Sequence, residues 1–181
     1  MTWRETLALI REDLAANGND TSRPGFRTLM VYRFGVWRMT VRTAILRAPL
    51  SFLYRRGFYH CRNVYGIELP YTVRLGRRVV IEHQGGIVVH GLCAIGDDCV
   101  IRQNCTLGVR TIDRPGEVPT LLARVSLGAG AVILGPVTIG AGAAIGANAV
   151  VLRDVPAGAL AIGVPATIRL RGAEATDMSG A

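Results

Sequence analysis

The chain of 181 residues contains no lysine, so arginine alone supplies the positive side of its net charge of +8. It also lacks acids over one long stretch, since no Asp or Glu lies between Thr21 and Ile67. Such a basic segment can meet phosphate, an acidic glycan or an anionic membrane surface. No recognised nucleic-acid-binding motif accompanies the charge, and we therefore expect no nucleic-acid partner. The segment holds nine arginines: Arg23, Arg27, Arg33, Arg38, Arg42, Arg47, Arg55, Arg56 and Arg62.

Long apolar runs and paired cysteines are also missing. No stretch reaches 18 apolar residues, and the N-terminal "MTWRETLALIREDL" carries acids that a signal peptide lacks. We therefore expect a cytoplasmic protein without a transmembrane helix. The four cysteines, Cys61, Cys93, Cys99 and Cys105, form no CxxC pair. We expect them to be buried as small hydrophobic residues, with neither a disulfide nor a metal.

Aromatic residues make up only 6% of the chain, so the core must be aliphatic. The pattern of apolar residues divides the chain into a helical N-terminal region (1–66), a repetitive domain (67–170) and a flexible C-terminal tail (171–181). Helical spacing of Leu7, Ile10 and Leu14 predicts a first helix that ends at Asn17-Gly18. A second helix is predicted in "GFRTLMVYRFGVWRMTVRTAIL", and a third has Pro49 in its first turn.

From Leu69 onward the sequence has a period of six. This period fits neither a long helix nor an alternating strand, but it fits a solenoid of short strands that turns a corner every six residues. Between Leu107 and Leu121 the repeat is broken by a polar segment with Pro115-Gly116, which predicts a functional loop at 109–120. Two runs of aliphatic or small residues carry the period: Leu75, Ile81, Ile87, Cys93, Cys99 and Cys105, and then Leu127, Ile133, Ile139, Ile145 and Val151.

The repeats "IEHQGGIVVHGLCAIGDDCVIRQNCTLG" and "GAGAVILGPVTIGAGAAIGANAVVLRDVPAGALAIGVPA" resemble the serine acetyltransferase family of hexapeptide-repeat acyltransferases. The resemblance covers about Glu68 to Ile168. The N-terminal "RPGFRTLMVYRFGVWR" is most similar to a short branch of that family, the colanic acid and exopolysaccharide biosynthesis acetyltransferases. The resemblance implies a mainly β fold, a left-handed parallel β-helix with 18 residues per turn and a short helical N-terminal region. It also implies a homotrimer that uses acetyl-CoA as cosubstrate and needs no metal.

The same resemblance implies the catalytic residues. A histidine that follows an acid is the general base of the family, and His83 occupies that place. Its supporting carboxylate corresponds to Glu68. The chemistry suits these residue types, because an alcohol must lose its proton as it attacks a thioester, and an imidazole with a pKa near 6.5 accepts that proton at neutral pH. A carboxylate on the far nitrogen fixes the tautomer. We expect His90 to be a coil-surface residue and His60 to be structural.

Further site residues follow from the resemblance. Backbone amides near Gly108 would stabilise the oxyanion of the tetrahedral intermediate. The small residues Ala129, Ala147 and Gly163 would let the pantetheine arm of CoA approach the backbone. Arg153 and Arg169 are candidates for the nucleotide phosphates.

The acceptor is predicted from a departure from the family pattern. Serine-specific members hold the amino acid with an Arg-His pair before a proline of the loop, and this chain has Glu117 and Val118 before Pro119. Glu82 replaces the usual aspartate before the base. A carboxylate buried without its cation is costly, so we favour a hydroxyl on a sugar of an exopolysaccharide precursor, small or lipid-linked. The arginine-rich N-terminal region would then touch the inner membrane face. Serine O-acetylation in cysteine biosynthesis is the alternative.

Two other classes of protein remain to be distinguished. A zinc hydrolyase similar to the γ-class carbonic anhydrases requires three histidine ligands, and the coil offers only His83 and His90. A non-catalytic β-helix used for assembly would leave the loop and the group of Glu68, Glu82 and His83 without a role.

Overall fold

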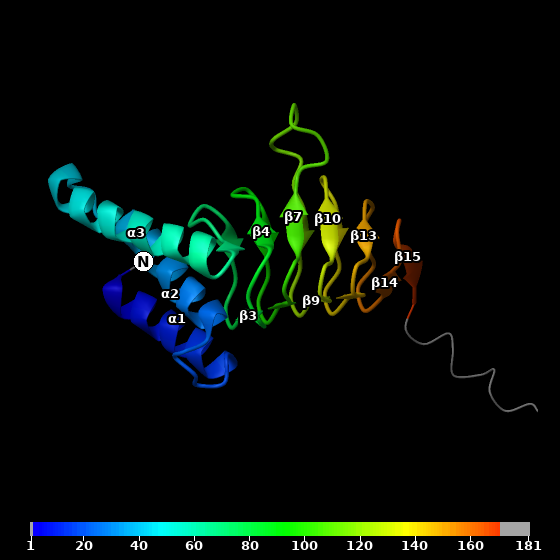
Figure 1. The fold of residues 1–181 in the computed structure, drawn as a ribbon, viewed down its shortest axis with the longest axis horizontal. Helices are drawn as coiled ribbons and strands as arrows, with labels where there is room; N and C mark the ends of the chain where they lie inside the picture. The colour runs from blue at the N-terminus through cyan, green and yellow to red at the C-terminus, as the bar shows by residue number, and fades with distance from the viewer. Residues whose placement is uncertain (1, 171–181) are drawn as a thin grey trace, which may run out of the picture.

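The computed structural model describes residues 2–170 and shows three helices packed on one end of a long coil of short strands (Figure 1). We call the helices the helical cap and the strands the β-coil. The cap consists of α1 (Trp3–Ala16), α2 (Pro24–Arg38) and α3 (Ala44–Val64). The predicted C-terminal tail lies outside the described residues. The first strand begins at Ile67, close to the boundary expected between the two parts of the chain.

Local sequence explains where the helices begin and end. Thr2 and Glu5 form a capping box at the start of α1, and Asn17 ends that helix, as the Asn-Gly breaker predicted. Pro24 occupies the first turn of α2, where a missing N–H costs nothing. The prediction for Pro49 was wrong, because α3 begins at Ala44 and Pro49 lies inside it. The helix therefore lacks one backbone hydrogen bond at this point.

The β-coil has three parallel sheets that form the sides of a triangular prism. The sheet orders are β1-β4-β7-β10-β13, β11-β8-β5-β2 and β15-β14-β12-β9-β6-β3. Successive strands up to β13 therefore move to successive sheets, whereas β14 and β15 both belong to the third sheet. Only β15 pairs antiparallel, with β14, which departs from the all-parallel expectation. The strands are β1 (Ile67–Glu68), β2 (Arg74–Leu75), β3 (Val80–Ile81), β4 (Ile87–Val89), β5 (Ala94–Ile95), β6 (Val100–Ile101), β7 (Thr106–Gly108), β8 (Thr120–Leu121), β9 (Ser126–Leu127), β10 (Val132–Leu134), β11 (Thr138–Ile139), β12 (Ala144–Ile145), β13 (Val150–Val151), β14 (Leu160–Ile162) and β15 (Thr167–Arg169).

The register corrects the expectation of 18 residues for every turn. Ile81 pairs with Ile101 and Val89 pairs with Leu107. The connection from Ile81 to Val89 therefore spans eight positions, whereas the equivalent connection from Ile101 to Leu107 spans six. The two extra residues enlarge the corner that contains His83. The hexapeptide frame places His83 level with the inward aliphatic positions, but the structure puts it in this enlarged corner.

The interior of the β-coil is aliphatic, as the composition predicted. Its largest fully buried side chains include Ile87, Leu107, Leu127 and Ile133. Cys93, Cys99 and Cys105 are all buried in this core and precede strands of three different sheets. Burying such side chains contributes about 1.5–3 kcal/mol each, and the stacked layers repeat this contribution along the coil.

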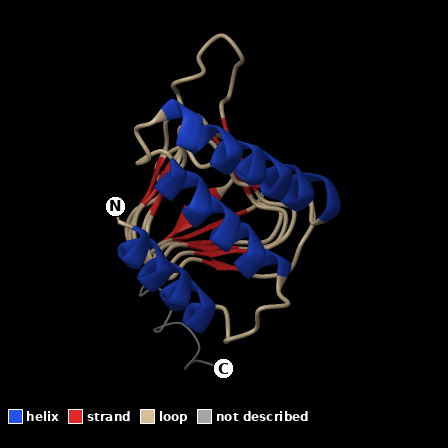
Figure 2. Cartoon of the chain, turned by 90° about the vertical axis from the view of Figure 1, so that its left-hand side faces the viewer, coloured by secondary structure: helices blue, strands red, loops and turns tan. Residues whose placement is uncertain are grey.

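Polar contacts join the helical cap to the first turn of the β-coil. Arg33 makes a buried ion pair with Asp13, with Nε 2.8 Å from Oδ2, and also donates to the carbonyl oxygens of Leu75 and Gly76. The Tyr32 hydroxyl donates to the Val73 carbonyl at 2.6 Å. The cap therefore lies across the open end of the prism and covers its interior (Figure 2).

Candidate active site

The candidate site lies where the connections from the third sheet to the first form one edge of the prism, which we call the His83 edge. Strand pairing makes Ile81, Ile101, Leu127, Ile145 and Ala161 equivalent in successive turns. Two residues after each of these strand positions, the chain lies in the connection to the first sheet. The residues at this corner position are His83, Gln103, Ala129, Ala147 and Gly163.

His83 has a left-handed backbone conformation, which it shares with residues such as Arg78 and Arg124 at other corners of the coil. Its φ is 67°, in the left-handed region, which the later corners of this edge fill with Asn104, Gly130 and Asn148. Asparagine and glycine tolerate this region, whereas most side chains are strained there. His83 is exposed at its corner, so its imidazole is open to a ligand.

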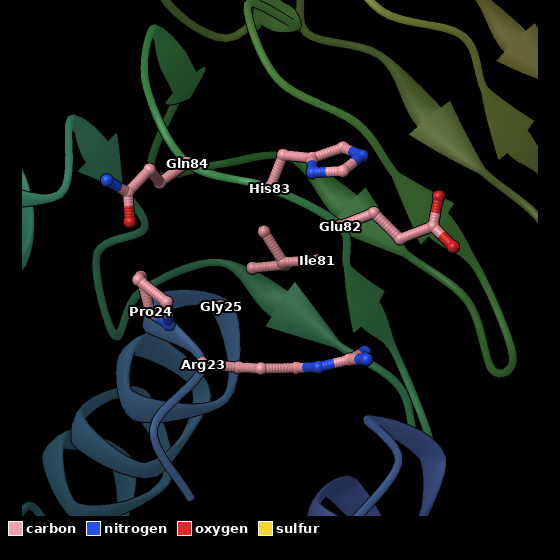
Figure 3. Close-up of a pocket in the computed structure, with 7 residues that line it drawn as sticks. All are labelled: Arg23, Pro24, Gly25, Ile81, Glu82, His83 and Gln84. Carbon is pink, nitrogen blue, oxygen red and sulfur yellow. The ribbon is translucent and has the colours of Figure 1, made fainter. Parts of the chain in front are cut away.

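The His83 corner and the start of α2 enclose a cavity of about 540 Å³. Figure 3 shows that His83 and Glu82 extend to the same side of the corner, whereas Gln84 extends to the other. The cavity therefore brings an imidazole, a carboxylate and a guanidinium to one place, the chemistry required to bind and deprotonate a small polar molecule. It is lined by Arg23, Pro24, Gly25, Ile81, Glu82, His83 and Gln84.

The carboxylate of Glu82 is already paired. Arg102, one turn further along the coil, donates from Nε to Glu82 Oε2 at 2.8 Å. Both side chains are partly exposed, so the pair contributes little to stability but orients the carboxylate beside the cavity. Sequence reasoning found Glu82 and missed Arg102, although the 20-residue register of these turns would have placed the two side by side.

Glu68 lies on β1, beside the strand that follows His83. Its backbone is in register with Val88 of β4. In the described part of the chain, no hydrogen bond or ion pair joins Glu68 to His83. The two corners themselves are close, since a β-carbon built on Gly66 would meet the Cα of Gly85 at 2.9 Å. The role of Glu68 as the orienting carboxylate stays a prediction.

The loop that connects β7 to β8 stands out from the coil and carries the predicted acceptor residues (Figure 1). Arg114 pairs with Glu117 across 3.2 Å, and Val118 packs against the core. The loop follows the C-terminal end of β7, whereas His83 precedes the N-terminal end of its parallel neighbour β4. Within one chain, Glu117 and His83 therefore belong to opposite edges of the same sheet.

The predicted cofactor residues divide between these two edges. Ala129, Ala147 and Gly163 share the His83 edge, and they present only small groups along it. The turns stack closely just before this position, since a β-carbon on Gly128 would lie 2.6 Å from the Ala147 nitrogen. Gly108 ends β7 and lies on the opposite edge, at the base of the loop.

The two predicted phosphate-binding arginines lie near the end of the coil. Arg153 lines a cavity of about 300 Å³ with Leu152, Pro165, Ala166 and Thr167, next to the Gly163 segment. Arg169 is exposed on β15. His90 lies on the loop edge, where its Nδ1 accepts a weak hydrogen bond from the Leu92 amide at 3.4 Å.

Within residues 2–170 no cluster of three or more His, Cys, Asp or Glu side chains could hold a metal ion. None of the described helices is long and apolar enough to cross a membrane.

The fold and the His83 edge place the chain among the hexapeptide-repeat proteins. Residues 120–153 match the family model described as bacterial transferase hexapeptide (six repeats). The structure is similar to a solved serine acetyltransferase in complex with CoA, with a TM-score of 0.76 and 27% identity, over 92% of this chain and 71% of that one.

The relatives narrow this class to one family. A serine acetyltransferase of Helicobacter pylori strain J99 is 36% identical over 143 residues, which cover 79% of this chain and 80% of the relative. One from Synechococcus elongatus is 34% identical over 92% of this chain and 66% of its own length. The chain belongs to the serine acetyltransferase family. It spans about two thirds or less of some relatives, for example 61% of a Bacillus pumilus serine acetyltransferase. The resemblance to the exopolysaccharide branch stays a prediction.

Proposed function

We propose that the protein transfers the acetyl group of acetyl-CoA to the hydroxyl of L-serine. The observation that carries this proposal is the exposed imidazole of His83, which shares a cavity with Glu82 at the enlarged corner. Relatives that match most of the chain are named serine acetyltransferases, which favours serine over a sugar as the acceptor.

His83 supplies the base that the reaction needs. The imidazole takes the hydroxyl proton while the hydroxyl oxygen attacks the acetyl carbonyl carbon, and it then returns the proton to the departing sulfur of CoA. A base of this kind typically contributes about 10²–10⁴-fold to the rate. Glu68 is proposed to hold the far nitrogen of His83 once the site is occupied, and the Gly108 amide to donate to the oxyanion.

The His83 edge offers a path for acetyl-CoA. Ala129, Ala147 and Gly163 continue the line of His83 toward the end of the coil, so an extended pantetheine arm along them would bring its thioester to the imidazole. Arg153, beside the Gly163 segment, is proposed to meet the phosphates. A solved family member in complex with CoA supports the choice of cosubstrate.

We propose that a homotrimer completes the site. His83 and the loop lie on opposite edges of one sheet, so Glu117, Val118 and Gly108 could reach the His83 cavity only from a second copy. Three prisms packed edge to edge would pair each His83 edge with a neighbouring loop. Sedimentation equilibrium should then give three times the chain mass of 19.4 kDa.

A sugar hydroxyl is the second candidate acceptor, and the loop favours it. The two positions that hold serine in the resemblance carry Glu117 and Val118, and Glu117 is engaged by Arg114. These two positions give serine no cation, whereas the Glu117 carboxylate could accept hydrogen bonds from sugar hydroxyls.

The acceptor assay separates these candidates. Release of CoA from acetyl-CoA should be saturable in L-serine and weak with neutral hexoses. Saturable turnover with a hexose and none with serine would replace serine by a sugar. The absence of turnover and of any calorimetric binding of CoA would contradict the acyltransferase function itself.

We also propose that α3 rests on an anionic membrane surface, which would suit a cytoplasmic enzyme that acts on lipid-linked sugars. Its outward face exposes Ile45, Leu46, Phe52 and Leu53, with Arg55 and Arg56 beside them. Apolar side chains next to cations are typical of interfacial helices. Sedimentation with phosphatidylglycerol vesicles, and not with phosphatidylcholine vesicles, is the expected result; equal recovery with both would contradict it.

A further inference from the structure

One of the residues that line the cavity at His83 is a cationic side chain, Arg23, to which no role has yet been given. We infer that Arg23 binds a carboxylate of the acceptor, so that the acceptor is a hydroxy acid rather than a neutral alcohol. This inference rests on the proposed function and deepens it, because it concerns the acceptor side of the same cavity.

Arg23 is held at the cavity by the way α2 meets the coil. It is the N-cap residue of α2, and its side chain makes no capping hydrogen bond. Gly25 follows it in the first turn and packs directly on the coil, since a β-carbon there would lie 2.2 Å from the Ile81 carbonyl oxygen. Ile81 immediately precedes Glu82 and His83, so this contact places the start of α2 beside the candidate base.

The guanidinium of Arg23 keeps most of its donors available. Among residues 2–170 it makes one ion pair, from Nε to Asp20 Oδ2 at 3.7 Å, which is longer than a hydrogen bond. Asp20 itself accepts two shorter hydrogen bonds from Ser22, at 2.6 and 2.8 Å, and these hold the pKa of the Asp20 carboxyl below its ordinary value. The side chain of Arg23 is 51% exposed, so a ligand can reach it.

The charges around the cavity favour an acid. Glu82 is neutralised by Arg102 at 2.8 Å, so Arg23 leaves the cavity with an excess of positive charge. The planar guanidinium can hold a carboxylate through two parallel hydrogen bonds. Arg23 thereby supplies, from the helical cap, the cation that the loop lacks at Glu117.

An α-amino acid with a hydroxyl fits these three groups together. The carboxylate would meet Arg23, the ammonium would meet Glu82, and the hydroxyl would lie at His83. A uronic acid offers the same carboxylate and hydroxyl without the ammonium. The shared feature is the carboxylate, and the two sources differ in whether Glu82 gains a second cationic partner beside Arg102.

The test compares acceptors with and without a carboxylate in the wild type and in Arg23→Gln. The acceptors are L-serine and L-serinamide, and glucuronate and glucose. In the pair of acceptors that the wild type acetylates, the acid should have a higher kcat/KM than its neutral analogue. Arg23→Gln should raise the KM for that acid about 10- to 100-fold, with a small change in kcat and little change for the matched neutral acceptor. The KM of Arg23→Lys for that acid should lie between the values of the wild type and of Arg23→Gln.

Two variants control for structure. Arg4→Gln removes an exposed arginine of α1, and Asp20→Asn removes the weak partner of Arg23; neither should raise the KM. An equal loss with acids and neutral acceptors in Arg23→Gln, or no preference for the acid in the wild type, would overturn the inference.

If no acceptor is acetylated, the proposed function fails and the inference is decided by binding instead. Calorimetry with L-serine and with glucuronate should then show binding to the wild type and at least tenfold weaker binding to Arg23→Gln. Equal affinity in the two proteins, or no binding to either, would overturn the role of Arg23.

Discussion

The helical cap and the β-coil are stabilised in different ways. The coil repeats one kind of packing, with an aliphatic or small residue at each inward position. Its buried residues form one continuous core from Ile67 to Ala161. The cap depends on single contacts that occur once, such as the pair of Asp13 and Arg33 and the approach of Gly25 to Ile81. A periodic sequence therefore specifies the coil redundantly, whereas the position of the cap depends on a few residues.

The candidate site lies where these two parts meet. His83 and Glu82 come from the coil, and Arg23 comes from the cap. We therefore expect changes at the contact between them to affect activity more than stability, and changes inside either part to do the reverse.

The largest effect on stability is expected from Asp13→Asn. This change leaves the buried guanidinium of Arg33 without its carboxylate, and breaking a buried pair in this way costs about 3–5 kcal/mol. Urea denaturation would measure the loss. The matched control is Glu12→Gln, which breaks the more exposed pair with Arg77 and should cost less than about 1 kcal/mol. Equal losses in the two variants would show that the buried pair does not hold the cap.

A smaller loss of stability with a large loss of activity is expected from Gly25→Ala. The added methyl would collide with the Ile81 carbonyl and push α2 away from the His83 corner. Overpacking of this kind costs about 1–3 kcal/mol. Turnover should fall in this variant and stay normal in Gly57→Ala, whose β-carbon would lie 3.2 Å from the side chain of Val31, inside the cap. Normal turnover in Gly25→Ala would mean that the cap contributes nothing to the site.

The smallest expected effect is on the reactivity of the cysteine thiols. Their labelling measures how readily the cap and the coil open locally. Burial raises the pKa of the Cys93 thiol to about 12, and burial also raises the pKa of Cys61, Cys99 and Cys105. All four should stay protonated and unlabelled by iodoacetamide at pH 8. In low urea, Cys61 of the cap should react before the three cysteines of the coil, as mass spectrometry of peptides would show. Simultaneous labelling of all four would contradict a separately opening cap.

The sequence predicts the coil far better than the cap. Period-six spacing identifies the inward residues and the loop because each turn repeats the same packing. It fails at the His83 corner, where two extra residues keep the aliphatic spacing of six but shift the strand register. It also misses Arg23, because a contact between residues far apart in the chain leaves no local pattern. Glu82 and His83 could be found, whereas their partners Arg102 and Arg23 required the register and the placement of α2.

The central claim is that His83 is the base of an acetyl transfer. Its most direct test is the steady-state release of CoA from acetyl-CoA by His83→Ala, with L-serine as acceptor. We predict a fall in kcat of about 10²–10⁴-fold, with the circular dichroism spectrum and the oligomeric state of the wild type retained. A correctly folded His83→Ala protein that turns over within a fewfold of the wild type would contradict the account.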